Sequence, residues 1–155
     1  MWNNKRSIYA SIVVCFIVAV LLLIVVVFGP YLYNLYMTSD RGLIDDPAVI
    51  KELGKIFAWA FYPSSVFAAV ILYSLLRLLF NIRKGEVFIN ANIVYFKVIY
   101  WCLFAIAIVA FVSGIFYLPF MIVAAAFGFV GVLLRVLKNV MVGAVELRTE
   151  NDLTI

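Results

Sequence analysis

Few side chains in this sequence could do chemistry, and the carboxylates of one polar stretch are the first to consider. The stretch covers about residues 33–55 and holds four acids, which are Asp40, Asp45, Asp46 and Glu52. Carboxylate oxygens can bind a divalent cation, but this spacing does not match a calcium-binding loop. A solvated loop that leads into a helix explains the acids better, because Asp46 followed by Pro47 is a typical helix start. We therefore predict no metal site.

The hydroxyl groups give no stronger case for catalysis. Histidine is absent, so a Ser-His-Asp triad cannot form, although Ser-Lys variants exist. Ser64, Ser65 and Ser113 lie inside apolar segments, where a serine commonly bonds its own helix backbone. Contact with a substrate is the weaker alternative. Gly128 and Gly131 lie in another apolar segment and do not form a phosphate-binding loop. We predict no catalytic residue, no cofactor and no enzyme activity.

The composition indicates that the chain is embedded in a membrane. Of the 155 residues, 68% are hydrophobic and 13% are charged, against about 45–50% apolar and about 25% charged in soluble domains. A soluble fold of this size could not bury so much apolar surface, so lipid must act as the solvent for much of it. The net charge of +4 then indicates orientation in the membrane rather than direct binding of nucleic acid.

Four apolar segments are long enough to cross a bilayer, which takes about 20 mostly apolar residues. The predicted spans cover about residues 8–30, 56–80, 96–118 and 119–143. We expect Gly29-Pro30 to break or kink the first span and Pro63 to kink the second. The first span is too long for a cleaved signal peptide, so we interpret it as an uncleaved anchor. The prediction is an all-α membrane protein, a four-helix transmembrane bundle in a single domain over residues 1–155.

Small residues at a spacing of four mark the faces through which these helices should pack, because helices in lipid associate by close contact. They lie in the last three spans and comprise Ala60, Ser64 and Ala68, Ala110 and Gly114, and Ala124 and Gly128. Together they favour a compact bundle. Dimerisation through the same faces, giving a homo-oligomer, is the alternative that the sequence leaves open.

Lysine and arginine are distributed unequally between the two sides of this topology and set its predicted orientation. Nine of the twelve fall on one side, namely Lys5, Arg6, Arg77, Arg83, Lys84, Lys97, Arg135, Lys138 and Arg148. The outer loop of about residues 33–55 holds the other three. We therefore predict that both termini and the loop of residues 81–92 lie in the cytoplasm.

That cytoplasmic loop reads NIRKGEVFINAN. Lys84 and Gly85 suit the end of the second helix, since cations are favoured there and glycine takes the left-handed cap. Asn90 is the predicted N-cap of the third helix, with Asn92 in its first turn. Nearby cations form a predicted basic ring, which comprises Arg77, Arg83, Lys84, Lys97, Arg135 and Lys138. Contact with anionic membrane lipid is the favoured role of the ring, and docking of an acidic partner is the alternative.

The C-terminal tail, residues 147–155, carries carboxylates that do not stabilise a helix end. Acidic groups near a helix C-terminus oppose its dipole, so we expect the fourth helix to extend to about Glu146 and then to fray. Glu146, Glu150 and Asp152 would then either pair with the basic ring of the same molecule or be presented to a partner.

The loop and the tail together carry a resemblance. The loop contains Lys84, Gly85, Phe88 and Asn92 in a K-G-x-x-F pattern with an asparagine after it, and the chain ends E-N-D-L-T-I at residues 150–155. In this layout the sequence resembles the DUF2975 family of small bacterial membrane proteins, with Val87 where members often have proline. The resemblance implies a four-span protein of the bacterial inner membrane that has no established activity and is often encoded beside a small helix-turn-helix regulator.

Two hypotheses about function follow. The first is a regulatory binding module whose loop and tail keep a cytoplasmic partner, such as a small helix-turn-helix transcriptional regulator, away from DNA. Its predicted contact residues are Lys84, Gly85, Phe88, Asn92, Glu150, Asn151 and Asp152. The second is a membrane immunity protein or transporter accessory subunit that binds a small molecule, a lipid or a peptide. A cavity lined by Ser64, Ser65 or Tyr62 would favour the second.

Cysteine labelling in intact cells tests the predicted orientation. In a chain whose Cys15 and Cys102 are replaced by alanine, a single cysteine within residues 81–97 should resist a membrane-impermeant maleimide until the cells are opened. A single cysteine at Lys51 should react in intact cells, because it lies in the outer loop. Labelling of the first site from outside would overturn the orientation.

Overall fold

The computed structural model describes residues 4–38 and 47–153, and four helices account for nearly all of them. They are α1 (Asn4–Thr38), α2 (Pro47–Arg83), α3 (Asn90–Gly114) and α4 (Pro119–Leu153). Each helix is long and apolar enough to cross a membrane, and no strand occurs in these two ranges. The predicted all-α class with four candidate spans is confirmed, and it is the architecture of a multi-pass membrane protein.

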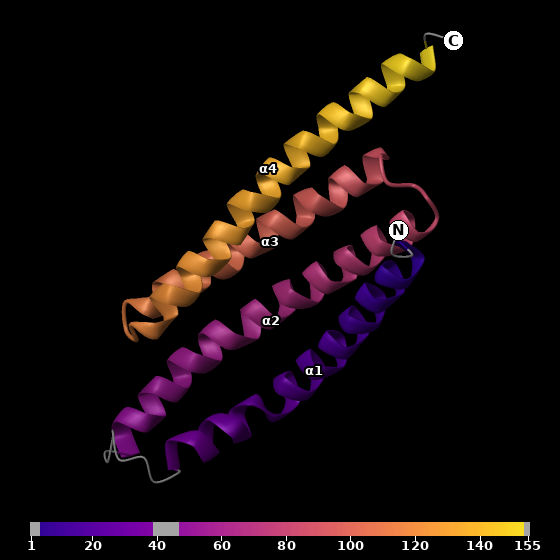
Figure 1. Ribbon diagram of the computed structural model, residues 1–155. Coiled ribbons are helices and arrows are strands. Elements are labelled where there is room, and N and C mark those ends of the chain that lie inside the picture. The colour runs from indigo at the N-terminus through magenta and orange to yellow at the C-terminus, as the bar shows by residue number, and fades with distance from the viewer. Residues whose placement is uncertain (1–3, 39–46, 154–155) are drawn as a thin grey trace.

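The four helices lie side by side in chain order, each antiparallel to the next (Figure 1). Within the part of the chain that the structure describes, backbone contacts join only consecutive helices. The start of α1, the α2–α3 loop and the end of α4 lie at one end of the molecule, which we call the charged end. The α3–α4 turn lies at the opposite end, which we call the turn end.

Glycines allow α3 and α4 to approach closely and set their register. A Cβ added at Gly114 would lie 2.8 Å from Cγ of Met121, and one added at Gly131 would lie 2.9 Å from Cε1 of Phe104. Gly128 faces Ala107 in the same register. These three pairs share one antiparallel register. A residue one position closer to the start of α3 therefore faces a residue one position closer to the end of α4.

The prediction that small residues mark the contact faces is confirmed at four positions. Ala60, Ala110, Gly114 and Ala124 are all buried. The other members of the three sets, Ser64, Ala68 and Gly128, are half-buried. Their small size lets neighbouring backbones come close, which is how helices gain van der Waals contact in lipid.

Helix α3 ends at Gly114, before the predicted end of the third span. The N–H of Phe116 bonds to Ser113 O at 3.1 Å, which begins a turn over residues 115–118. Pro119 follows at the first position of α4, where proline is favoured because its missing N–H needs no partner. The two helices therefore form an antiparallel hairpin joined by an uncharged connection.

Aromatic rings placed over glycines hold α1 against α2. A Cβ added at Gly54 of α2 would lie 3.2 Å from the ring of Tyr33 in α1, and one at Gly29 of α1 would lie 3.1 Å from the ring of Phe61 in α2. The hydroxyl of Tyr33 also donates to Ile50 O at 3.3 Å. Each helix thus supplies one aromatic ring, which packs over a glycine of the other helix.

The prolines interrupt neither of these helices. Helix α1 continues through Pro30 to Thr38 and α2 continues through Pro63. Of the two outcomes predicted at Gly29-Pro30, the break is wrong, and a kink there or at Pro63 stays a prediction. Backbone groups freed by a proline can be satisfied by local adjustment within a membrane helix. Helix α2 begins at Pro47, as predicted. Asp46, the predicted cap, lies outside the described residues.

Helix α4 continues to Leu153, so the expected fraying after Glu146 is wrong as far as residue 153. No glycine or proline interrupts the helix after Gly143, and Thr149 Oγ1 donates to Val145 O at 2.9 Å. The α3–α4 register puts the first residue of α3 level with Val145. Residues 146–153 therefore extend beyond α3 at the charged end (Figure 1), and we call this segment the overhang.

Two glycine substitutions in the same hairpin should have opposite effects on stability. Gly114→Ala should lower the free energy of unfolding by about 1–3 kcal/mol, because the new Cβ meets Met121 and overpacks the contact. Gly143→Ala should leave it unchanged or raise it by up to about 1 kcal/mol, because nothing lies within 4 Å of the added Cβ and alanine favours the helix. Denaturant unfolding in micelles, followed by circular dichroism, measures both. Equal losses in the two variants would contradict the close approach.

Candidate functional site

The α2–α3 loop, residues 84–89, begins with a well-defined cap on α2. The N–H of Gly85 bonds to Ile82 O and the N–H of Glu86 bonds to Asn81 O, both at 3.0 Å. These two bonds form a Schellman motif, which places a left-handed residue just after the helix. Gly85 takes that conformation with a φ of +87°. The predicted end of the second helix and its glycine cap are confirmed.

The side chain of Asn92 holds the rest of the loop from inside. It is 1% exposed, and its Nδ2 donates to the carbonyl oxygens of Glu86 and Val87 at 2.8 Å each. Its Oδ1 accepts a 2.8 Å bond from Asn81 Nδ2. One amide therefore ties the end of α2, the loop and the start of α3 together. Leaving such a buried group unpaired costs about 1–3 kcal/mol, so the loop conformation is strongly specified.

Two predictions about the asparagines need correction. The capping position before α3 is Ile89, with no side-chain cap bond, and Asn90 is the first residue of the helix with an exposed side chain. Asn92, predicted to contact a partner, is buried and fully engaged within the chain, so it shapes the loop instead. No role is predicted for Asn81 from the sequence. It stands out only as a polar residue at the end of an apolar helix, and its partner Asn92 lies on another helix.

The loop that Asn92 supports presents three side chains outward. Lys84, Glu86 and Phe88 are exposed, and Phe88 keeps 43% of its surface accessible. Gly85 is exposed between them. The structure thus brings Lys84, Gly85 and Phe88 together on one short connection with a fixed backbone. Aromatic rings are enriched in protein contact surfaces, whereas lysine and glutamate are depleted there.

Two arginines of the predicted basic ring contact tyrosine rings near the charged end. The guanidinium carbon of Arg83 lies 4.7 Å from the ring centroid of Tyr9, which joins the end of α2 to the start of α1. Arg77 Nε donates to the hydroxyl of Tyr73 at 3.1 Å within α2. Contacts of a cation with an exposed aromatic ring contribute about 0.5–1 kcal/mol each, so they orient these arginines more than they stabilise the fold.

The remaining cations lie at similar heights on neighbouring helices. The α3–α4 register puts Lys97 level with Lys138, and the Asn81–Asn92 bond puts Arg77 close to the same level on α2. Arg135 lies about one turn further from the charged end. These residues are exposed except Lys138, which is half-buried and donates to Asn139 Oδ1 at 3.2 Å. The basic ring is therefore a band across α2, α3 and α4 below the loop.

The acidic residues of the tail are carried by the overhang. Glu146, Glu150 and Asn151 are exposed, and the side chain of Asp152 lies outside the described residues. Because the overhang continues the axis of α4, it runs away from the basic ring and does not fold back over it (Figure 1). The loop and the overhang flank the start of α3 as two separate surfaces.

The loop and the overhang lie in a part of the chain that matches a known family. The family model described as "Protein of unknown function (DUF2975)" matches residues 45–155. The chain belongs to this family. The match covers the whole of α2, α3 and α4 and so contains the loop, the basic ring and the overhang. No curated protein and no solved structure matches the chain.

Replacing Asn92 in this DUF2975 protein should loosen the loop without removing a surface group. Asn92→Ala leaves Asn81 and two loop carbonyls without their partner, so we expect unfolding to become easier by about 2–3 kcal/mol. Amide exchange at Glu86, whose N–H bonds to Asn81 O, should accelerate. Asn90→Ala is the matched control, and its unfolding should change by less than about 0.5 kcal/mol. Equal protection of this amide in both variants would show that Asn92 does not hold the loop.

Proposed function

We propose that this protein is a non-enzymatic binding module of the bacterial inner membrane whose charged end captures a partner in the cytoplasm. The partner class that fits best is a small helix-turn-helix transcriptional regulator, held at the membrane and away from DNA. The observation that carries the proposal is the loop that Asn92 fixes from inside, because a buried side chain shapes a surface that none of the four described helices covers.

The fixed backbone of the loop supports this proposal on energetic grounds. Binding costs conformational entropy wherever a loop must become ordered, and a preorganised surface avoids much of that cost. The cap at Gly85 and the bonds of Asn92 supply this order before any partner arrives. Phe88 and Lys84 then provide an apolar contact and a charge on the same surface.

The overhang supplies a second surface with a different charge. It carries Glu146 and Glu150 as exposed carboxylates, with Arg148 between them. A DNA-binding surface is basic, so carboxylates on a projecting helix can compete with the phosphates of DNA for it. The loop and the overhang lie on either side of α3, and a small domain can contact both at once.

The basic ring has a separate role in this proposal. Lysine and arginine next to a membrane are attracted to anionic lipid headgroups by about 1 kcal/mol each. Arg77, Lys97, Arg135 and Lys138 lie below the loop, at the height where the helices leave the bilayer on the predicted orientation. They set the depth of the helices in the bilayer and so keep the loop above the membrane surface.

Paired aromatic substitutions at the two ends of the molecule test the proposal. We expect the full-length protein, solubilised in detergent from its own host, to recover a helix-turn-helix regulator, and Phe88→Ala to reduce that recovery at least fivefold. Phe116→Ala removes a more exposed ring at the turn end, 66% accessible against 43% for Phe88, and should leave recovery unchanged. Quantitative mass spectrometry of the eluted proteins measures both.

A truncated chain separates the loop from the overhang. Deleting residues 147–155 should also lower recovery, because it removes the second surface. The proposal fails if no DNA-binding protein is recovered, or if recovery is the same for the wild type, Phe88→Ala and the truncation.

A further inference from the structure

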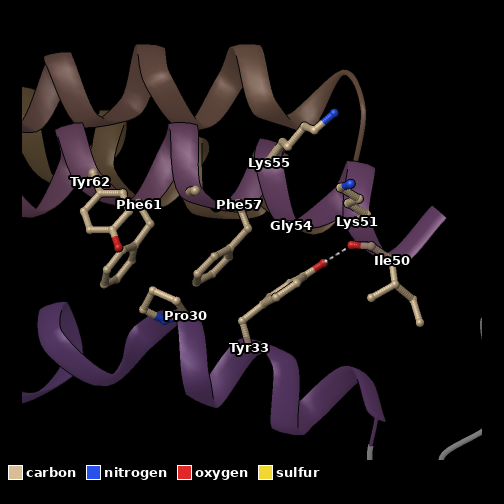
Figure 2. Close-up of a pocket in the computed structure, with 10 residues that line it drawn as sticks. Pro30, Tyr33, Ile50, Lys51, Gly54, Lys55, Phe57, Phe61 and Tyr62 are labelled. Carbon is tan, nitrogen blue, oxygen red and sulfur yellow. Dashed lines mark hydrogen bonds between the residues drawn. The ribbon is translucent and has the colours of Figure 1, made fainter. Parts of the chain in front are cut away.

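A hollow between α1 and α2 near the turn end has an aromatic wall and a charged rim (Figure 2). Its volume is about 420 Å³. The rings of Tyr33, Phe57 and Phe61 form the wall, stacked with centroids 4.9 and 5.3 Å apart. Lys51 and Lys55 line the edge of the hollow on α2, and the Lys55 side chain points away from the rings in Figure 2. The hollow thus has an apolar wall and two long, flexible lysine side chains at its edge.

A second hollow adjoins the first and is almost entirely apolar. It has a volume of about 430 Å³, and all four helices contribute to its lining. Phe57 and Phe61 line both hollows, so the two meet at these rings. Ser65 is the nearest hydroxyl group with a defined partner, and it donates to Tyr62 O at 2.7 Å. The second hollow therefore offers an occupant little beyond apolar contact.

The two hollows lie at different depths. Trp59 of α2 and Ser113 of α3 line one surface depression together, so the α3–α4 turn is level with this part of α2. Lys51 and Lys55 lie at or beyond that turn, toward the membrane surface. The second hollow continues along α2 from Phe57 to Leu72, which is about 22 Å at 1.5 Å per residue. One leaflet of hydrocarbon is about 15 Å thick, so this hollow can hold a whole acyl chain.

The hydrocarbon around the second hollow determines which molecules can fill it. An apolar hollow at hydrocarbon depth excludes water, which would find no polar partners there. Left empty, its lining loses van der Waals contact on one side. A bilayer lipid is the occupant at hand, and its acyl chain can enter sideways between the helices.

We propose that the two hollows form one binding site for an anionic phospholipid. Its acyl chain occupies the apolar hollow, and its phosphate lies at the rim beside Lys51 and Lys55. Among the residues that the structure describes at this rim, Glu52 is the opposing charge, since its Oε1 lies 2.6 Å from Lys55 Nζ. Two cations against one carboxylate leave this described part of the rim positive, and this favours an anionic headgroup over a zwitterionic one.

Native mass spectrometry of the full-length protein in detergent tests the headgroup part of this proposal. We expect one phosphatidylglycerol per chain, bound about tenfold more tightly than phosphatidylcholine. The double variant Lys51→Gln, Lys55→Gln should lose the single tightly bound phosphatidylglycerol and keep only the weaker preference that the basic ring gives, whereas Glu52→Gln should keep or increase the tight binding. Equal binding of the two lipids by the wild type, or an unchanged preference in the double variant, overturns the proposal.

Substitutions inside and outside the second hollow test the acyl-chain part. Ala68→Phe places a ring in the hollow and should abolish the single tightly bound lipid, whereas Val66→Phe adds the same ring on the exposed side of α2 and should not. If Ala68→Phe loses helical content by circular dichroism, Ser64→Leu is the milder variant, with the same expected loss. The site is contradicted if a folded Ala68→Phe or Ser64→Leu variant keeps the tightly bound lipid, or if Val66→Phe loses it equally.

A lipid headgroup that lacks an acyl chain distinguishes a lipid site from a site for free phosphate. Glycerol phosphate should not bind at concentrations where phosphatidylglycerol is saturating, because the apolar hollow supplies much of the contact. Binding of both with equal affinity would replace the lipid site with a site for soluble phosphate and overturn the proposal.

Discussion

The arrangement of this protein depends on the buried amide of Asn92, which has to find its hydrogen bonds inside the chain. Neither lipid nor packed side chains can replace a missing partner, so the amide dictates where its neighbours lie. Its donors take the carbonyls of Glu86 and Val87, and its oxygen takes the amide of Asn81. These bonds fix the register of α2 against α3 and draw the loop backbone inward. The side chains of Lys84 and Phe88 are left outside as a consequence.

Elsewhere the helices are held by shape, because burial of apolar surface does not drive helices together in lipid. Helices α3 and α4 use glycines to bring their backbones close, with Gly114 against Met121 and Gly131 against Phe104. Helices α1 and α2 place rings over glycines at the turn end and leave a hollow further along. Within the described ranges the backbone of α1 approaches only that of α2, so the space between α1 and the α3–α4 hairpin is lined by side chains and stays partly open. Different modes of packing thus give one filled interface and one open groove.

The two ends of the molecule differ in chemistry as a result. The charged end carries a fixed polar loop, a basic band and an overhanging helix of mixed charge. The turn end carries an aromatic hollow with two lysines at its rim, and it leads into an apolar groove. Between the two ends the helices present mainly apolar side chains to the bilayer. The proposals for a protein partner and for a bound lipid concern opposite ends, so either can hold without the other.

The sequence by itself determined the four helices, their order and the start of α2 at Pro47, because the length of an apolar run is a local property and lipid admits little besides a helix. It also determined the cap at Gly85, since a left-handed residue after a helix is a local requirement. Only the tertiary structure decided that Asn92 is buried, because its side-chain partner Asn81 lies on another helix. It also decided that α3 stops at Gly114, that α4 continues past Glu146, and that Phe57 and Phe61 join two hollows. Hydropathy adds up along the chain, whereas burial depends on which distant segments meet in space.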